Sequence, residues 1–331
     1  MPISAALDLI TVGSLFVELT PSSPREALSR AHQYTLVAGG AGANVVFALA
    51  RLGVRVGFIT AVGDDDFGTL AIDELSAFGV ETSFVRRATG QQTPVTFAAI
   101  DGRGGKRFAF YRFSGCCNPM ETLQSADFQR AARCRLFDFN EGSIRDPTLR
   151  PLVFQAAREA HAAGSAVLYA VNLRRHSWRG TDEDVRCIEA EAIRLADIVV
   201  LNEEEARFIS GLSSERGVRE IQASGPRIVV MTRGGDGDML LRVDAEQAVI
   251  PPFHVPVIYD VGAGDTFHAG LAAAALQDDP LAMSFPAWID AVRFAAATAA
   301  LRVSTSADPH DLPTFAEVIR WMEGRRVKGE E

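Results

Sequence analysis

The sequence predicts an α/β fold with a mostly parallel central sheet. Short apolar runs alternate along the chain with amphipathic segments of helical period, an order typical of β-α-β units. Glycine-rich turns stand directly before two predicted helices, at residues 39–44 and 262–264. Residues 93–112 break the alternation, because two strands joined by a glycine-rich turn predict a hairpin. Such a hairpin must lie outside a parallel sheet, as a lid or a dimer contact, or else as a simple edge decoration.

The individual elements follow from apolar runs bounded by turn residues. Strands are predicted at residues 7–12, 54–62, 135–139, 166–171, 197–201 and 226–232, and a further strand pair reaches residue 250. Helices are predicted at 45–52, 67–78, 149–163, 184–195, 286–303 and 313–322. A β-branched run from Val257 leads into the second glycine turn and an Ala-rich segment that ends near Leu276. We therefore expect a strand, a loop and a helix at that place.

Composition narrows the classes of function. The 331 residues suit one large domain with a small insertion as well as two domains, and the 47% apolar content predicts a substantial core. The net charge of -9 and the lack of a basic cluster before the tail argue against nucleic acid as a partner. The four cysteines lack metal-ligand or disulfide spacing, so a reducing cytoplasm is expected. No apolar stretch approaches the length of a membrane span, and no basic leader is present.

The second glycine turn carries the main chemical hypothesis. Gly262, Ala263 and Gly264 leave backbone N–H groups accessible, so the start of the following helix could bind an oxyanion. Asp265 stands in the first helical turn, where the helix dipole favours its ionised form. It is therefore a candidate base for a hydroxyl that receives a phosphoryl group. The alternative is an ordinary glycine turn in which Asp265 caps the helix.

Two features nearer the N-terminus are candidate substrate contacts. Gly39 and Gly40 open a bare turn against which a polyol could lie, with Asn44 as a further partner or only as a helix cap. Glu18 follows the end of the first strand, where ligands bind in parallel sheets, or it is a solvated loop residue. The turn does not match GxGxxG, and no GxxxxGK occurs. A dinucleotide oxidoreductase is therefore disfavoured.

Two more strand ends suit a nucleotide. Asn202 and Glu205 are three residues apart at the start of a helix, so both could face a hydrated Mg²⁺ near phosphates. The alternative is a capping Asn followed by acids in a first helical turn. Thr232, Gly234 and Gly237 follow another strand, and this arrangement suits a nucleotide edge or a hairpin turn.

Together these elements resemble the PfkB/ribokinase family of carbohydrate kinases along almost the whole chain. The turn at residues 39–44 is similar to the N-terminal sugar-binding signature of that family, and residues 262–265 are similar to the C-terminal one. Asn202 and Glu205 match its NxxE element, and the loop from Thr232 matches its TxGxxG element. The four elements occur in the order of the family, which makes the resemblance much more specific than any single motif.

The resemblance implies a ribokinase-like three-layer α/β/α core with a small β lid over the sugar. It implies one domain over residues 1–325, lid segments at about 15–37 and 90–115, and a tail at 326–331. ATP would lie along the C-terminal half, with Mg²⁺ held through water by Asn202 and Glu205. Asp265 would be the base, and the N–H groups of residues 262–264 would stabilise the transferred phosphoryl group. Many members dimerise through the lid.

The chain departs from the family pattern at recognition positions. Tyr259-Asp260 replaces the usual Asp-Thr pair, so the acid is shifted by one and the monovalent-cation site of many members is not supplied in its usual form. Glu18 stands where an Asp commonly contacts the sugar. Ala170 and Ala296 replace an Asp near the sugar and an Asn near the adenine. These departures indicate an altered sugar pocket beside retained catalytic residues.

Residues near two strand ends suggest the substrate branch. The segments ending at Arg112 and Arg174 resemble fructokinases and 2-keto-3-deoxygluconate kinases more than nucleoside kinases. Two arginines would suit a carboxylated sugar, but fructokinases share both elements. Both substrates are therefore expected about equally. Ribokinase or nucleoside kinase specificity, or a catalytically silent sugar- or nucleotide-binding protein, are the alternatives.

Overall fold

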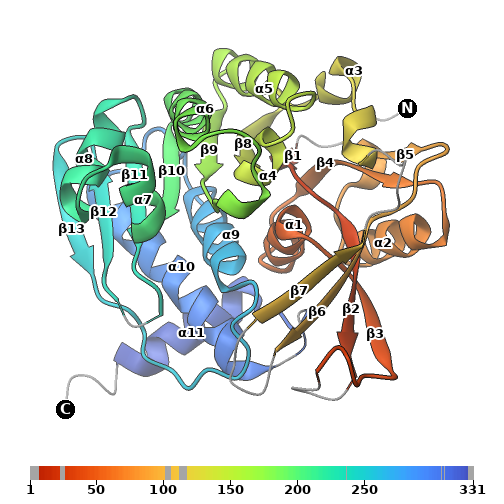
Figure 1. Cartoon of the computed structure of the whole chain (residues 1–331). Helices are drawn as coiled ribbons and strands as arrows, with labels where there is room; N and C mark the ends of the chain where they lie inside the picture. Colours follow the sequence, from red (N-terminus) through yellow and green to blue (C-terminus); the bar gives the residue numbers. More distant parts are fainter. Residues whose placement is uncertain are drawn as a thin grey trace.

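The computed structural model describes residues 7–22, 27–100, 106–111, 118–235, 237–306, 308 and 310–326. A central sheet lies between helices on both faces, and a second, smaller sheet stands to one side of it (Figure 1). The predicted α/β/α class is therefore confirmed. Within these residues, no helix is long and apolar enough to cross a membrane.

The described part of the central sheet has nine strands, in the order β13-β12-β11-β10-β9-β8-β1-β4-β5. They are β1 (Leu7–Val12), β4 (Val56–Gly63), β5 (Val85–Ala88), β8 (Cys134–Asn140), β9 (Ala166–Ala170), β10 (Ile198–Asn202), β11 (Ile228–Thr232), β12 (Met239–Val243) and β13 (Glu246–Ile250). The pairs β11/β12 and β12/β13 are antiparallel, and the other neighbours are parallel. The carboxyl ends of β1 and of β8 to β11 consequently share one edge.

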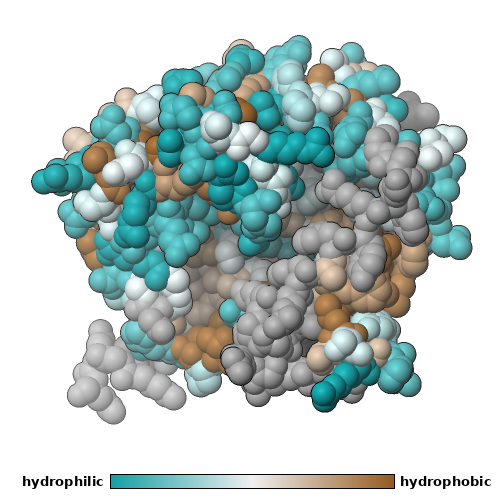
Figure 2. Space-filling model, viewed as in Figure 1, coloured by the Kyte–Doolittle hydropathy of each residue, from teal (hydrophilic) through white to brown (hydrophobic). Residues whose placement is uncertain are grey.

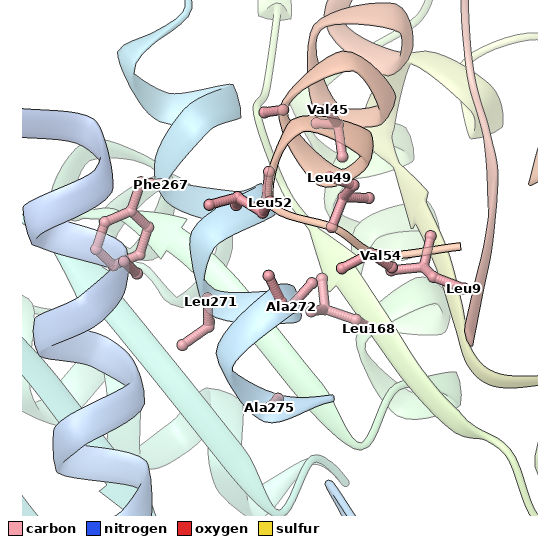
Figure 3. Close-up of a cluster of buried hydrophobic side chains, with 14 of the residues drawn as sticks. Leu9, Val45, Leu49, Leu52, Val54, Leu168, Phe267, Leu271, Ala272 and Ala275 are labelled. Atoms are coloured by element: carbon pink, nitrogen blue, oxygen red, sulfur yellow. The ribbon is translucent and has the colours of Figure 1, made fainter. Parts of the chain in front are cut away.

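Helices cover the two faces of this sheet around two separate apolar cores. One face carries α1 (Ala41–Arg51), α2 (Asp66–Ala77), α9 (Ala263–Ala275), α10 (Phe285–Thr305) and α11 (Phe315–Arg326). The other carries α5 (Arg150–Ala162), α6 (Asp182–Leu195), α7 (Glu203–Ser210) and α8 (Ser214–Ala223), with the short α3 (Ser125–Phe128) and α4 (Glu141–Ile144) nearby. On the first face, Leu49 of α1 and Ala272 of α9 pack with Leu168 of β9 (Figure 3). This packing fixes the starts of α1 and α9 relative to the sheet edge.

The lid is the four-stranded second sheet, of order β3-β2-β6-β7. Its strands are β2 (Phe16–Pro21), β3 (Tyr34–Gly39), β6 (Val95–Ile100) and β7 (Lys106–Tyr111). The antiparallel β6/β7 pair confirms the predicted hairpin, whose connecting residues 101–105 lie outside the described ranges. The apolar pattern predicted no individual strand at β2 or β3, although both fall largely in the lid segment at about 15–37 that the resemblance implied. Glu18 therefore lies in a strand rather than in a solvated loop.

The segment before α9 differs from the prediction. Residues 251–260 form no strand, although Val257 and Ile258 are β-branched. Pro256 cannot donate a ladder hydrogen bond, and Val257 and Ile258 are 61% and 52% exposed, so no neighbouring strand holds them. Instead, the N–H groups of Ile258 and Tyr259 donate to the carbonyl of Val303 in α10, at 2.8 and 3.2 Å. The expected strand is thus an extended connection fixed to the end of a helix.

Candidate active site

The phosphate cradle predicted at residues 262–264 lies at the N-terminus of α9. Gly262 caps the helix with φ 80°, a left-handed conformation that favours glycine. A Cβ added at Gly264 would meet no atom within 4 Å, so the backbone faces free space there. The N–H of Ala263 donates to the carbonyl of Asp260 at 3.2 Å. In this conformation Ala263 is therefore engaged within the turn, and the glycine backbone is the more accessible part of the cradle.

Two amides from different parts of the chain orient Asp265. Asn44 Nδ2 donates to Asp265 Oδ2 at 2.8 Å, and Asn172 Nδ2 lies 3.5 Å from the other carboxylate oxygen. Asn172 is held beyond the end of β9 with φ 41°, in the left-handed region that Asn tolerates. Because α1 begins at Ala41 with Gly40 as its cap, Asn44 is not a capping residue, and that alternative is wrong. Amide donors favour the ionised form of the carboxyl group.

Glu18 faces the same region from strand β2. Its side chain is 8% exposed, and a Cβ added at Gly39 would come within 3.2 Å of Glu18 Oε2. Gly40 has φ 116°, and its added Cβ would lie 2.6 Å from the Ser14 carbonyl, so a side chain at Gly39 would crowd Glu18 and one at Gly40 would clash with the backbone before β2. Burial, and secondarily the charge of Asp265, raise the pKa of Glu18 to about 7. That Glu18 contacts the substrate stays a prediction.

A cavity beside Asp265 contains residues that sequence reasoning missed. Glu18, Asn44 and Gly262 line it together with Arg302 of α10 and with His310. His310 Nε2 lies 3.1 Å from the Ala38 carbonyl. Arg302 and His310 are absent from every motif, and only tertiary packing brings them here. In the space-filling view, hydrophilic residues dominate the upper part of the face, around α6 and α7 (Figure 2).

The predicted nucleotide residues lie at the shared sheet edge. Asn202 at the end of β10 is the register partner of Thr232 at the end of β11. Gly234 follows with φ 76°, and a Cβ added at Gly237 would lie 2.5 Å from Arg233 Cβ. Both positions of this loop therefore require glycine. Thr232 thus lies beside Asn202, and Gly234 and Gly237 belong to the segment that follows β11.

Asn202 and Glu205 form a capping box on α7. Asn202 Oδ1 accepts the Glu205 N–H at 2.9 Å, and Glu205 Oε2 accepts the Asn202 N–H at 2.7 Å. Glu205 Oε1 accepts the Leu173 N–H at 2.8 Å, which fastens the loop that carries Asn172. Burial raises the pKa of Glu205, although these N–H groups oppose that shift. The two residues thus cap the helix, as the alternative predicted. A hydrated Mg²⁺ would contact them through its water molecules.

The structure says less about Arg112 and Arg174, the two arginines that were predicted to contact the substrate. Arg174 is exposed beyond β9. Burial raises the pKa of the nearby Glu141, and Arg145, Trp178 and Arg174 oppose that shift. Arg112 lies outside the described residues. Arg174 is not among the described residues that line the cavity with Glu18.

Comparison with known proteins decides the family. Residues 6–314 match the profile described as "pfkB family carbohydrate kinase". The chain belongs to this family. It is an ATP-dependent sugar kinase, that is, a phosphotransferase that acts on a sugar hydroxyl.

Curated relatives and solved structures of PfkB kinases match over nearly the full length. Fructokinase-1 of Zea mays is 27% identical over 317 residues, covering 95% of this chain and 97% of the relative. The 5-dehydro-2-deoxygluconokinase of Clostridium perfringens is 26% identical over 322 residues, covering 96% and 93%. The structure of Xylella fastidiosa fructokinase with bound ATP aligns with a TM-score of 0.84 at 26% identity, covering 96% of this chain and 99% of that one.

A buried His–Asp contact connects α9, the helix that carries Asp265, to the central sheet of this PfkB kinase. His268 is one turn beyond Asp265 on α9, and its Nε2 lies 2.7 Å from Asp138 Oδ1 in β8. Thr11 Oγ1 donates to the other Asp138 oxygen at 2.6 Å. The Asp138 charge and hydrogen bond raise the pKa of His268 against the opposing effect of burial. His268 is therefore a buried residue that joins α9 to β8.

Proposed function

We propose that this kinase transfers the γ-phosphoryl group of ATP to a primary hydroxyl of a small neutral sugar, with fructose as the favoured substrate. The observation that carries the proposal is the orientation of Asp265 by the Asn44 amide, 2.8 Å away, directly beside the glycine cradle. The carboxylate of Asp265 and the N-terminus of α9, which can bind an anion, therefore lie beside the same space. Phosphoryl transfer requires both alignment and stabilisation of charge on the equatorial oxygens.

Asp265 acts as the base in the proposed reaction. The sugar oxygen attacks the γ-phosphorus, and its proton passes to the Asp265 carboxylate. The bond between the γ-phosphorus and the bridging oxygen breaks, and ADP carries away that electron pair. Backbone N–H groups at Gly262 and Gly264 and the α9 dipole stabilise the negative charge of the transferred group. Closure of the lid over the sugar limits hydrolysis by water.

ATP is proposed to lie along the sheet edge that carries Asn202 and Thr232. Gly234 and Gly237 would let the nucleotide approach the backbone of their loop, and Asn202 and Glu205 would hold Mg²⁺ through water. A water-mediated role fits these residues, because hydrated Mg²⁺ keeps several waters and both Glu205 oxygens already accept backbone N–H groups. When bound, Mg²⁺ neutralises charge on the phosphate oxygens.

The chemistry of the cavity favours a neutral sugar. Glu18, Asn44 and Asp265 are partners for hydroxyl groups, and two nearby carboxyl groups disfavour an acidic ligand. Arg302 lines the cavity but donates to the Ser306 carbonyl and lies over a tyrosine ring. A keto-deoxygluconate remains the second candidate, because the 5-dehydro-2-deoxygluconokinase relatives match as extensively as the fructokinases do.

A panel assay tests this proposal. ADP release is measured with fructose, 2-keto-3-deoxygluconate, 5-dehydro-2-deoxygluconate, ribose and nucleosides at equal concentrations. We expect the highest kcat/KM with fructose. Preference for a deoxygluconate would replace the favoured substrate by the second candidate, and preference for ribose or a nucleoside would contradict both.

Replacing Glu18 with Gln should remove the change in kcat/KM that we expect near pH 7 in the wild type. In the wild type, kcat/KM for the sugar should rise through about pH 7 as Glu18 ionises and accepts hydrogen bonds from sugar hydroxyls. Its folded pKa of about 7 exceeds the ordinary 4.5, so folding stability should fall as pH rises from about 4.5 to about 7, by at most about 3 kcal/mol. Rate profiles and denaturant unfolding between pH 5 and pH 8 measure both effects.

The control for this prediction is Glu220→Gln, on the exposed face of α8. It should keep the wild-type pH profile and the same fall in stability. If the Glu18→Gln variant retained the transition near pH 7, another group would be responsible for it.

A further inference from the structure

The connection that leads into the phosphate cradle is fastened to the C-terminal end of α10. Ile258 and Tyr259 donate their N–H groups to the Val303 carbonyl, at 2.8 and 3.2 Å. Tyr259 is 8% exposed, and it stands three residues before Gly262. The position of the cradle backbone therefore depends on what packs around Tyr259.

Arg302 packs there as a buried cation. Its side chain is 2% exposed, and its guanidinium carbon lies 5.5 Å from the centre of the Tyr259 ring. Nη1 donates to the Ser306 carbonyl at 2.9 Å, at the end of a helix where the dipole favours positive charge. Burial lowers the pKa of Arg302, and Tyr259, Asp311 and Asp308 oppose that shift. These partners hold a fixed positive charge beside the entry to the cradle.

The residues around Tyr259 and Arg302 do not fit a bound monovalent metal ion. Tyr259 stands where the family pattern described above usually has Asp, so an aromatic ring occupies that position in this chain. A guanidinium facing that ring would repel a second cation at close range in a region screened from water. Among the described residues, no group of three or more His, Cys, Asp or Glu side chains could hold a metal ion.

We propose that Arg302 replaces the monovalent cation of related kinases, so that this enzyme needs no added K⁺ or Na⁺. The guanidinium holds Tyr259, and through it the backbone of residues 259–262, in the position from which the cradle N–H groups reach the phosphoryl group. Arg302 is thus a positioning residue rather than a catalytic one. The inference rests on the proposed phosphoryl transfer at Asp265.

The first test compares KCl with choline chloride at equal ionic strength. Wild-type kcat should agree within about twofold, and its melting temperature should be the same in both salts. Activation by K⁺ of about tenfold or more, or a clear rise in melting temperature in KCl, would overturn the proposal. The melting measurement needs no substrate. If no sugar in the panel were phosphorylated, only the substrate assignment would fail, and the salt effect on melting would still decide this point.

The second test removes the positive charge of Arg302. Arg302→Met, an uncharged side chain of similar length, should lower kcat about tenfold in choline chloride and leave the KM for ATP and sugar within about twofold. Arg302→Lys retains the charge and should recover most of the rate. A purely structural role would lower the melting temperature of both variants without this difference in kcat. Wild-type kcat in folded Arg302→Met would contradict the proposal.

Discussion

Replacing Asp265 with Asn should lower kcat by about 10²–10⁴-fold while ATP and sugar still bind. The amide has nearly the same shape, so the hydrogen bonding of the site needs only local rearrangement, but it cannot take the proton of the sugar hydroxyl. Asn44 Nδ2 would face an amide in place of a carboxylate oxygen, and rotation of the new side chain can present its own oxygen to it. Binding constants from calorimetry, beside single-turnover rates, separate chemistry from binding.

The matched control is Asp290→Asn, which makes the same change on the exposed face of α10. It should keep wild-type rates and affinities. An Asp265→Asn enzyme with an unchanged rate would remove Asp265 from its role as the base, and a loss of sugar affinity equal to the loss of rate would make it a binding residue.

Replacing Gly264 with Val should lower kcat/KM by about 10²-fold or more with little change in stability. An added Cβ at Gly264 meets nothing within 4 Å, so the folded protein has room for the side chain. That room is the space in which we propose the phosphoryl group lies, beside Asp265. A branched side chain there would displace the phosphate from the cradle and from alignment with the sugar hydroxyl.

Gly324→Val provides the matched control for this prediction. Gly324 is also a helical glycine whose added Cβ meets nothing within 4 Å, but it lies on α11. Both variants should gain a similar, small amount of helix stability, because Val has a higher helix propensity than the Gly that it replaces in each helix. The two variants should therefore have similar melting temperatures and should differ only in the rate of phosphoryl transfer. Equal activity of both variants would show that the phosphoryl group does not occupy the space beside Gly264.

The parallel core was predictable from sequence because its strands are buried on both faces. β4 and β9 are buried at every position, so β9 is one continuous apolar run and β4 is apolar or Gly apart from Thr60. The glycine turns at α1 and α9 were predictable for a related reason: Gly40 and Gly262 have positive φ values that few other residues adopt. The order of these local signals was enough to indicate the family.

Features that depend on partners distant in sequence were not predictable. The lid strand β2 pairs with β3 and β6, so Glu18 is buried by segments that carry no local sign of the pairing. Residues 257–259 have the composition of a strand, but the sheet offers them no neighbour and α10 binds them instead. Arg302 likewise looks like an ordinary helical arginine until Tyr259 is placed against it.

The hydrogen bond between Asn44 and Asp265 joins residues 221 positions apart in the chain. The two helices that carry them can form locally. The Asp265 carboxylate, however, is oriented by Asn44 only after the first and last quarters of the polypeptide have packed together. Contacts of such long sequence separation form late, because the intervening chain must first be closed into a loop. Recovery of phosphoryl transfer during refolding should consequently lag behind recovery of helical content, and turnover would report completed assembly of the whole chain.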